Sequence, residues 1–355
     1  MNISSLSLRG FRSYKSGSFE FSPGVNIVCG PNARGKTNLL EGIYMLSGAY
    51  SWRSRKRAEL VNFESRTALI SGRVNSRGRE FELSVSMPLQ GKSSFKSNGV
   101  SLKRQYELSE YLKCVIFCPE DLFLVKGGPE KRRRFIDSAL GQLRPRYAAI
   151  LSEYSRLCDM KQILLKEGGY SGVMPEINRG LIYYGAELIY YRARYIKELS
   201  TESEIIHRNI SGGLERLELK YRTLSNIEDP LVPNERLREL YLEHMAEHSD
   251  AERDSGSVLS GPHKDDLEIY INGYSAKSFA SQGQARTAAL SLKFGERELM
   301  RLDTGEYPVL LLDDVLSELD DDRADFVASS SLGGQTVITC CVKPRAFRGA
   351  LMTEL

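Results

Sequence analysis

The sequence is poor in the residues and patterns that build metal sites. It has six cysteines and four histidines in 355 residues, and none of them forms a C-x-x-C pair or a close cluster. Zinc ligands come in closely spaced groups, so no zinc site is expected. Cys29 and the adjacent Cys340 and Cys341 lie in apolar, strand-like runs, as buried thiols do in the reducing cytosol. We therefore expect a cytoplasmic protein.

Long apolar stretches and repeats are also missing. No run approaches the roughly 18 apolar residues that a membrane-spanning helix needs, and the N-terminal residues lack the apolar core of a signal peptide. Sustained heptads are absent as well, which argues against a long coiled coil. We expect a soluble protein, for which any role at a membrane would need a partner.

The charges nearly balance, but they are unevenly distributed along the chain. The net charge is +3, which by itself is too small to indicate nucleic-acid binding. Residues 1–60 carry nine Lys and Arg against three Asp and Glu, whereas residues 201–260 carry seven against thirteen. This asymmetry predicts a basic N-terminal part and an acidic central part.

Residues 30–37 contain the strongest motif of the chain. They read GPNARGKT and match the P-loop pattern G-x-x-x-x-G-K-[ST] at every fixed position, between the apolar run 25–29 and a helix-like stretch, 37–48. Backbone N–H groups of such a loop surround a phosphate, Lys36 would neutralise the β- and γ-phosphates of ATP, and the Thr37 hydroxyl would hold Mg²⁺. The residues expected to bind the nucleotide are Gly30, Pro31, Asn32, Ala33, Arg34, Gly35, Lys36, Thr37 and Asn38.

A second motif lies near the other end of the chain. Four apolar residues, 309–312, are followed by Asp313 and Asp314, which is typical of a Walker B strand with a carboxylate at its end. Asp313 would support Mg²⁺ opposite Thr37, and Asp314 stands where a general base could orient the attacking water. A buried strand that ends in a plain acidic turn is the alternative interpretation.

A third motif, SQGQ at 281–284, stands just before a helix-like stretch. Ser281, Gly283 and Gln284 could bind a phosphate at the helix N-terminus, although a plain N-cap explains the same residues. One P-loop needs no second phosphate site for its own nucleotide, so this motif would bind the nucleotide of a second subunit. Residues 316–320, directly after the Walker B strand, resemble a D-loop or, equally well, a capped helix start.

The order of these motifs predicts an α/β architecture in three parts. Strand-like runs and the P-loop fill residues 1–125, mostly helical sequence fills 126–254, and strands and helices return in 255–355. We predict one nucleotide-binding head built from both ends of the chain, with a mainly helical lobe inserted between its halves.

The combined pattern resembles the ABC ATPase superfamily, on the branch with split heads, and within it the RecF family of DNA repair ATPases. The segments that carry the resemblance are 8–14 (LRGFRSY), 35–41 (GKTNLLE), 119–122 (PEDL), 132–137 (RRRFID), 259–266 (LSGPHKDD), 281–284 (SQGQ) and 311–320 (LLDDVLSELD). The resemblance implies an ABC-type, Rad50-head-like fold and a homodimer that closes on ATP and Mg²⁺. It also implies binding to duplex DNA beside single-stranded gaps, and action with the RecO and RecR proteins to load RecA.

Two departures limit this comparison. Most ABC ATPases have Glu where this chain has Asp314, so we expect slow, DNA-stimulated hydrolysis. No clear Q-loop glutamine or switch histidine is visible; Glu120 and Thr339 stand nearest to their expected places.

Basic runs supply the candidates for DNA contact, since Lys and Arg bind phosphates without reading the base sequence. Solvated helix faces are an equally good explanation of each run. The candidate DNA-binding residues are Arg53, Arg55, Lys56, Arg57, Lys131, Arg132 and Arg133. Arg12 and Tyr14 precede the P-loop, and Arg12 could contact phosphate and Tyr14 the base. Plain surface positions explain both residues nearly as well.

Three other functions remain open from the sequence. A transporter-type ATPase subunit coupled to a membrane partner is disfavoured by the long insert. A short clamp resembling SMC or Rad50 proteins is disfavoured by the missing heptads, and a P-loop kinase by the motif at Ser281.

Overall fold

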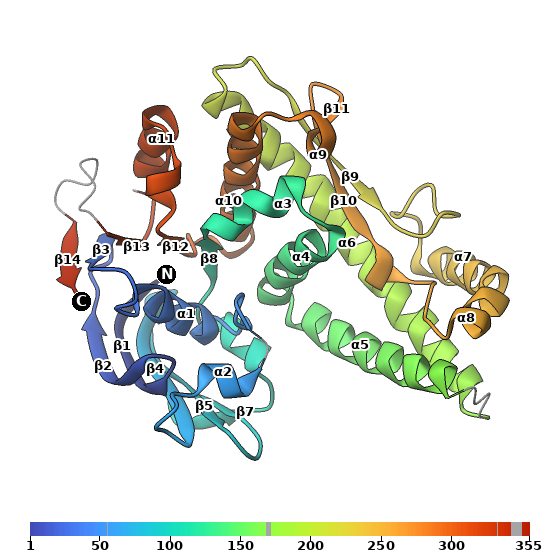
Figure 1. The fold of residues 1–355 in the computed structure, drawn as a ribbon, viewed down its shortest axis with the longest axis horizontal. Coiled ribbons are helices and arrows are strands. Elements are labelled where there is room, and N and C mark those ends of the chain that lie inside the picture. Colours follow the sequence, from blue (N-terminus) through green and yellow to red (C-terminus); the bar gives the residue numbers. More distant parts are fainter. Residues whose placement is uncertain (55, 168–171, 332, 342–349) are drawn as a thin grey trace.

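A computed structural model describes residues 1–54, 56–167, 172–331, 333–341 and 350–355. The two ends of the chain combine into a head at the left of Figure 1, and the middle of the chain forms a helical lobe at the right.

The head is built around a parallel sheet with the strand order β14-β3-β13-β12-β8. The first half of the chain supplies β3 (Val25–Cys29) and β8 (Cys114–Phe117), and the second half supplies β12 (Val309–Asp313), β13 (Thr336–Cys340) and β14 (Leu351–Glu354). The sequence did not predict β14. Because parallel strands are covered on both faces, the central ones are continuous apolar runs, and all five residues of β12 are buried.

The parallel sheet separates two hydrophobic cores. Leu310 and Leu312 of β12 point into the core that is shared with α10 (Gln282–Thr304), while Val309 and Leu311 point into the core that contains α1 (Lys36–Leu46). Alternation along one strand therefore positions the P-loop helix on one face and the helix that begins with the SQGQ motif on the other.

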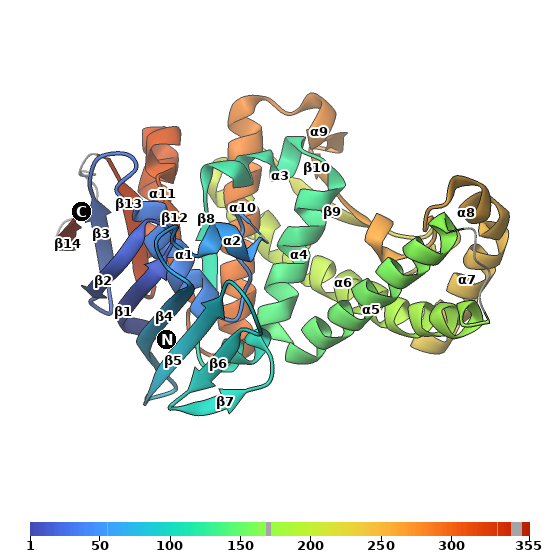
Figure 2. The ribbon, with the colours of Figure 1, turned by 60° about the horizontal axis from the view of Figure 1, so that its bottom comes forward.

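A second, antiparallel sheet covers the far side of α1, as Figure 2 shows. Its order is β2-β1-β4-β5-β6-β7. The strands are β1 (Asn2–Phe11), β2 (Tyr14–Glu20), β4 (Thr67–Ser76), β5 (Arg79–Pro88), β6 (Ser94–Ser97) and β7 (Val100–Leu102). An Asn98-Gly99 hairpin turn joins the last two, with φ of 49° and 76° at these residues.

The lobe consists of long helices and a small sheet. The helices are α4 (Pro129–Leu143), α5 (Pro145–Lys166), α6 (Met174–Ile210), α7 (Asn234–Glu247) and α8 (Ser249–Ser255). The sheet has the order β11-β10-β9, from β9 (Leu217–Arg222), β10 (Asp266–Ile271) and β11 (Tyr274–Ser275). Strand β9 lies inside the segment predicted to be mainly helical and pairs with β10 across residue 254, so the division at that residue remains a proposal.

Short elements connect these parts. They are α2 (Arg57–Leu60), α3 (Phe123–Lys126), α9 (Ala276–Phe279), α11 (Asp321–Ser331) and the 3-10 turns η1 (Gln105–Glu110), η2 (Pro119–Leu122), η3 (Pro262–Lys264) and η4 (Val315–Glu318). Among the described residues, no helix is both long and apolar enough to cross a membrane.

Candidate nucleotide-binding site

The P-loop has the tight curvature that its glycines allow. Gly35 has φ of 97° and caps α1, and Ala33 is also left-handed, with φ of 67°. A Cβ on Gly35 would lie 2.9 Å from Ser13 Oγ and 3.0 Å from the Tyr14 hydroxyl, which leaves no room for a side chain. The loop and the first turn of α1 thus form a backbone cradle of the kind that binds phosphate.

Lys36 lies inside this cradle. Its side chain is buried, and its ammonium donates hydrogen bonds to the carbonyl oxygens of Gly30 and Pro31, the latter at 3.0 Å. Its Nζ is also 3.4 Å from Cys341 Sγ. The loop is therefore wrapped around a positive charge, as an anion site requires.

The Walker B carboxylate meets the P-loop helix directly. Thr37 Oγ1 donates to Asp313 Oδ1 at 2.9 Å, although 276 residues separate the two in sequence. Burial raises the pKa of Asp313, while hydrogen bonds from Thr339 and Thr37 lower it. A hydroxyl and a carboxylate that already touch supply two hard oxygen ligands, so these residues fit Mg²⁺.

Thr339 holds this arrangement from the neighbouring strand. Its Oγ1 donates to Asp313 Oδ1 at 2.8 Å and accepts the Asp314 N–H at 3.1 Å. Thr339 is fully buried. Its place near the missing switch histidine stays a prediction. In the structure its side chain orients the Asp313 carboxylate and holds the backbone of Asp314.

Asp314 has a left-handed backbone, with φ of 52° and ψ of 23°. This conformation is uncommon outside glycine, and backbone strain of this kind is found at functional sites. The Asp314 N–H is also 3.2 Å from the Thr339 carbonyl oxygen. The acid proposed as general base therefore occupies a fixed turn, half-exposed, at the carboxyl edge of the parallel sheet.

Glu120 follows β8 at the same edge. Because the carboxyl ends of parallel strands meet at one edge of a sheet, residues after β8 and β12 come close together. The charge of exposed Glu120 raises the pKa of Asp313. Its role as the Q-loop residue remains a prediction.

The residues before the P-loop lie beside it. Tyr14 donates its hydroxyl to the Gly35 carbonyl at 3.2 Å. Arg12 Nε and Nη2 bind both oxygens of the buried Glu41 at 2.8 and 2.6 Å, and its Nη1 binds the Glu59 carbonyl. Three of the five N–H groups of Arg12 thus have partners within the chain, and the expected contact with phosphate would use one of the two that remain on Nη1 and Nη2.

Arg53, for which DNA binding stays a prediction, lies beside the nucleotide site. Its Nη1 donates to Asn38 Oδ1 at 2.9 Å, and its charge lowers the pKa of Asp313. Asn38, predicted to bind the nucleotide, and Arg53 therefore lie together at the start of α1.

The SQGQ motif is a capping box at the start of α10. Gln284 N–H donates to Ser281 Oγ at 3.1 Å, and Ser281 N–H donates to Gln284 Oε1 at 2.8 Å. The N-cap interpretation is therefore correct for the single chain. It does not conflict with phosphate binding, because the cap uses Ser281 Oγ only as an acceptor and leaves its own O–H free to donate. A Cβ on Gly283 would lie 3.4 Å from Arg323 Nη2, which is ordinary van der Waals contact.

Arg323 of α11, which the sequence did not single out, ties the D-loop-like segment to this motif. Its Nη2 donates to the Gly283 carbonyl at 3.1 Å and its Nε to Thr287 Oγ1 at 2.9 Å. Its Nη1 pairs with Asp320. No local pattern marks this residue, because its partners come from a helix that lies 36 to 40 residues earlier in the chain.

The candidate DNA residues do not form one surface. Arg132 was predicted to bind DNA, and this is wrong because its side chain is 3% exposed and binds both oxygens of Asp266 at 2.7 and 2.9 Å. Arg133 Nη1 donates to the Asp265 carbonyl, and exposed Lys56 pairs weakly with Glu59. Arg55 lies outside the described residues, while Arg57 and Lys131 both line a cavity between head and lobe.

Comparison with known proteins decides the family. A family model described as the RecF/RecN/SMC N terminal domain matches residues 2–350. The DNA replication and repair protein RecF of Bacillus subtilis is 38% identical over 348 residues, covering 96% of this chain and 93% of its own. The RecF protein of Oenococcus oeni is 42% identical over 334 residues, covering 91% of this chain and 88% of its own. This chain belongs to the RecF family.

Solved structures agree with this membership. The recombination mediator protein RecF-ATPrS in the RecFOR pathway has a TM-score of 0.92 at 33% identity, covering all of this chain and 96% of its own. A RecF-ATP structure has a TM-score of 0.89 at 34% identity, covering 97% of this chain and 92% of its own. An SMC head bound to the C-winged helix domain of ScpA has a TM-score of 0.53 at 18% identity. The match covers 97% of this chain and 90% of that one, and it shows the fold alone. The predicted ABC-type ATPase fold is confirmed. The comparisons support the RecF family and give no support to the transporter, clamp and kinase alternatives.

Proposed function

We propose that this RecF-family chain is an ATP-controlled DNA-binding protein of recombinational repair and replication. The observation that carries the proposal is the contact between Thr37 of the P-loop and Asp313 of the Walker B strand. It unites two motifs from opposite ends of the chain into one site for ATP and Mg²⁺.

Each residue of the site has a distinct task in this proposal. The P-loop backbone and Lys36 hold the phosphates, Thr37 and Asp313 hold the metal, and Thr339 keeps Asp313 oriented. Bound Mg²⁺ would neutralise charge on the β- and γ-phosphate oxygens. Asp314 would accept a hydrogen bond from the attacking water and draw its proton.

The second half of the site would come from another copy of the chain. Ser281 and Gln282 are exposed at the start of α10. They offer a hydroxyl proton that the cap does not use and the positive end of a 23-residue helix. In an ATP-closed homodimer these groups would face the γ-phosphate bound by the partner. Arg323 joins the same turn to Asp320, so closure at the nucleotide would also set the D-loop-like segment.

DNA and other repair proteins would use the closed state. The known relatives are DNA replication and repair proteins, and the matching structures belong to the RecFOR pathway. We assign to this chain sequence-independent binding of duplex DNA beside single-stranded gaps, and cooperation with RecO and RecR in loading RecA.

Hydrolysis would be slow and would serve to reopen the dimer. The Asp314 side chain is one methylene shorter than that of the usual glutamate, and its backbone is fixed in a left-handed turn. Removing its base function in Asp314→Asn should lower turnover by about 10²- to 10⁴-fold while ATP still binds. Steady-state ATPase assays with and without DNA check this, and fast wild-type turnover that Asp314→Glu leaves unchanged would contradict it.

The proposed function is tested by fluorescence anisotropy with a labelled gapped duplex. We expect tight binding with Mg·ATP, weak binding with Mg·ADP or without nucleotide, and loss of the ATP effect in Lys36→Ala. Binding that is equally strong in all three nucleotide states would overturn ATP control.

A further inference from the structure

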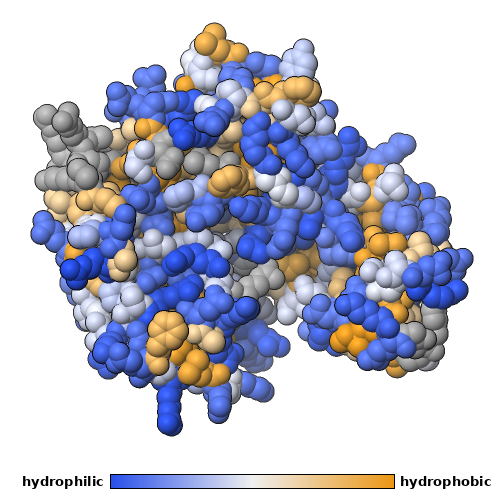
Figure 3. Space-filling view, viewed as in Figure 1, coloured by the Kyte–Doolittle hydropathy of each residue, from blue (hydrophilic) through white to orange (hydrophobic). Residues whose placement is uncertain are grey.

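We propose that the cavity between head and lobe receives an unpaired nucleotide of the bound DNA. This inference rests on the proposed DNA-binding function and places one part of it. Figure 3 shows a notch between head and lobe on a face where hydrophilic side chains predominate.

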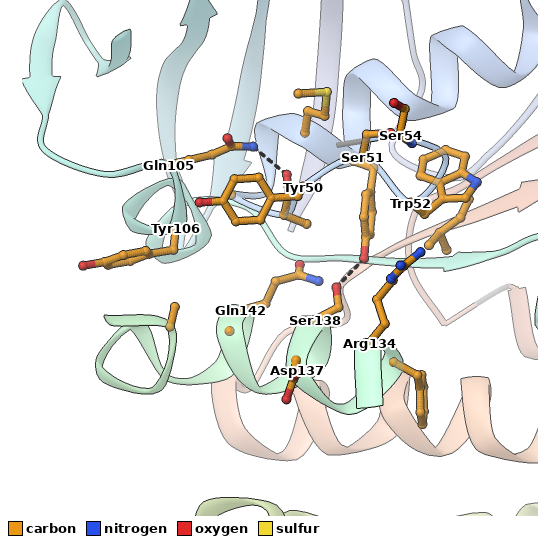
Figure 4. A pocket seen from close by; sticks show the side chains of 18 of the residues that line it. Tyr50, Ser51, Trp52, Ser54, Gln105, Tyr106, Arg134, Asp137, Ser138 and Gln142 are labelled. Carbon is orange, nitrogen blue, oxygen red and sulfur yellow. Dashed lines mark hydrogen bonds between the residues drawn. The ribbon is translucent and has the colours of Figure 1, made fainter. Parts of the chain in front are cut away.

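The cavity has the size of a ligand site. Its volume is about 640 Å³, within the ~300–1,000 Å³ typical of small-molecule pockets. Figure 4 shows Arg134, Ser138 and Gln142 of α4 on one side, facing the segments Tyr50–Trp52 and Gln105–Tyr106 on the other. Parts of the chain that are far apart in sequence therefore form its walls.

Positive charge gathers in this lining. Arg57, Arg104, Lys131 and Arg134 all line the cavity, so the two basic runs of the sequence meet here. Of these, Arg134 pairs with the exposed Glu130 at 2.8 Å. Through its side chain Arg104 makes no hydrogen bond or ion pair with any residue that the structure describes, and Arg57 donates only to the carbonyl oxygens of Pro88 and Gly91. Cations without acidic partners are what a phosphate backbone requires.

The acids of the lining are largely neutralised within the chain. Asp137 pairs with Arg192 at 2.8 Å, and Glu296 pairs with Lys293 at 2.7 Å. Asp121 accepts the Cys118 N–H at 2.9 Å and lies near the charge of Lys293. Glu120 is exposed, and its charge also acts on Asp313 of the nucleotide site. The unbalanced charge of the lining is therefore mainly positive.

Aromatic rings complete the match to a nucleotide. Tyr50 is 69% exposed and Tyr106 is half-buried. Trp52 packs edge-on against Tyr44, with the ring centroids 5.4 Å apart. Aromatic faces stack on bases of any sequence, and this requires a base that is not already stacked in a duplex. Cations beside stacking surfaces thus favour an unpaired nucleotide over duplex DNA.

The chain carries a probe for this cavity, because Trp52 is its only tryptophan. Intrinsic fluorescence of the full-length protein with Mg·ATP is titrated with gapped duplex and with blunt duplex of equal length. Anisotropy of the labelled DNA is recorded in the same samples. We expect both DNAs to bind and only the gapped one to quench Trp52.

Two variants and two matched controls test the assignment. Tyr50→Ala should weaken gapped-DNA binding roughly 5- to 150-fold, the range expected for one stacked base. Arg104→Ala should weaken binding and lower the salt slope by about one. Tyr274→Ala removes an equally exposed tyrosine (68%) outside the cavity, and Lys103→Ala removes the neighbouring exposed cation, so neither should change binding.

The anisotropy and the Trp52 fluorescence together distinguish the proposed DNA-binding function from the proposed unpaired-nucleotide site. If anisotropy shows no DNA binding, the proposed function fails and this inference fails with it. If DNA binds but Trp52 is unaffected, or blunt duplex quenches it equally, the function stands and the unpaired-nucleotide site is wrong. Equal losses in the variants and their controls would likewise overturn it.

Discussion

At the scale of single residues, the candidate site depends on hydroxyl groups that fix carboxylates. Thr37 and Thr339 both donate to Asp313 Oδ1, one from α1 and one from β13. The Asp313 carboxylate is buried, so each of these hydrogen bonds offsets part of the cost of keeping it charged.

Thr339 provides a selective test because it would touch neither nucleotide nor water in the proposed mechanism. Thr339→Val keeps the shape of the side chain but removes the donor to Asp313. We expect ATP turnover to fall about 10- to 100-fold, as for other residues that orient a metal ligand. Thr339→Ser should restore most of the activity, and full turnover in the valine variant would contradict the role.

The sequence predicted the residues of the site that belong to local motifs. The P-loop is recognisable within eight residues, and Asp313 follows directly from an apolar run. Thr339 and Arg323 have no such signal, because their roles arise from strand pairing and helix packing with residues far away in sequence.

At the scale of elements, a largely buried ion pair holds parts of the lobe together. Arg132 of α4 binds Asp266 of β10 with two hydrogen bonds and also donates to the carbonyl oxygens of Leu124 and Gly127. It therefore links α4 to the small sheet and to the end of α3.

Arg132→Ala should destabilise the protein without a direct effect on DNA contact. Breaking a buried pair costs about 3–5 kcal/mol, and because Asp266 is 29% exposed we expect about 2–3 kcal/mol here. Urea unfolding measures the change. Arg134→Ala on the same helix, which breaks an exposed pair with Glu130, should cost under about 1 kcal/mol. A stable Arg132→Ala variant with weakened DNA binding would restore the original prediction.

Most elements could be predicted from hydrophobic pattern, and the exceptions have physical reasons. Strand β9 alternates buried and less buried residues, but it is short and lies within a charged, helix-rich stretch. Strand β14 has four residues and no fully buried side chain. Asn234, a residue type that favours the N-cap position, is instead the first residue of α7, and its side-chain amide donates to Glu187.

At the scale of the whole molecule, the lobe and its junction contain histidines that are held neutral. Burial is the main cause that lowers the pKa of His207, His244 and His263 below the ordinary value of 6.5. His263 is fixed by Tyr154 at 2.8 Å and by the Val258 carbonyl at 3.1 Å, an arrangement that suits a neutral ring.

These histidines predict a loss of stability in mild acid. The unfolded chain takes up protons near pH 6.5 and the folded chain only at lower pH, so the free energy of unfolding is highest above pH 6.5 and falls as the pH drops through it. The loss is limited to about 1.4 kcal/mol per unit of pKa difference for each histidine. Urea unfolding at pH 7.5 and 6.0 measures it. His263→Gln should reduce the difference, and equal stability at both values would contradict the prediction.

The central claim is that ATP joins two copies of the chain through Ser281. Sedimentation velocity without nucleotide, with Mg·ADP and with Mg·ATP tests it on wild type, Ser281→Arg and the control Ser101→Arg, an exposed serine of β7. We predict that Mg·ATP alone produces dimers of wild type and Ser101→Arg, while Ser281→Arg binds ATP but stays monomeric. Dimers that form in every nucleotide state, or a Ser281→Arg variant that dimerises normally, would contradict the shared site and leave the SQGQ motif as a helix cap.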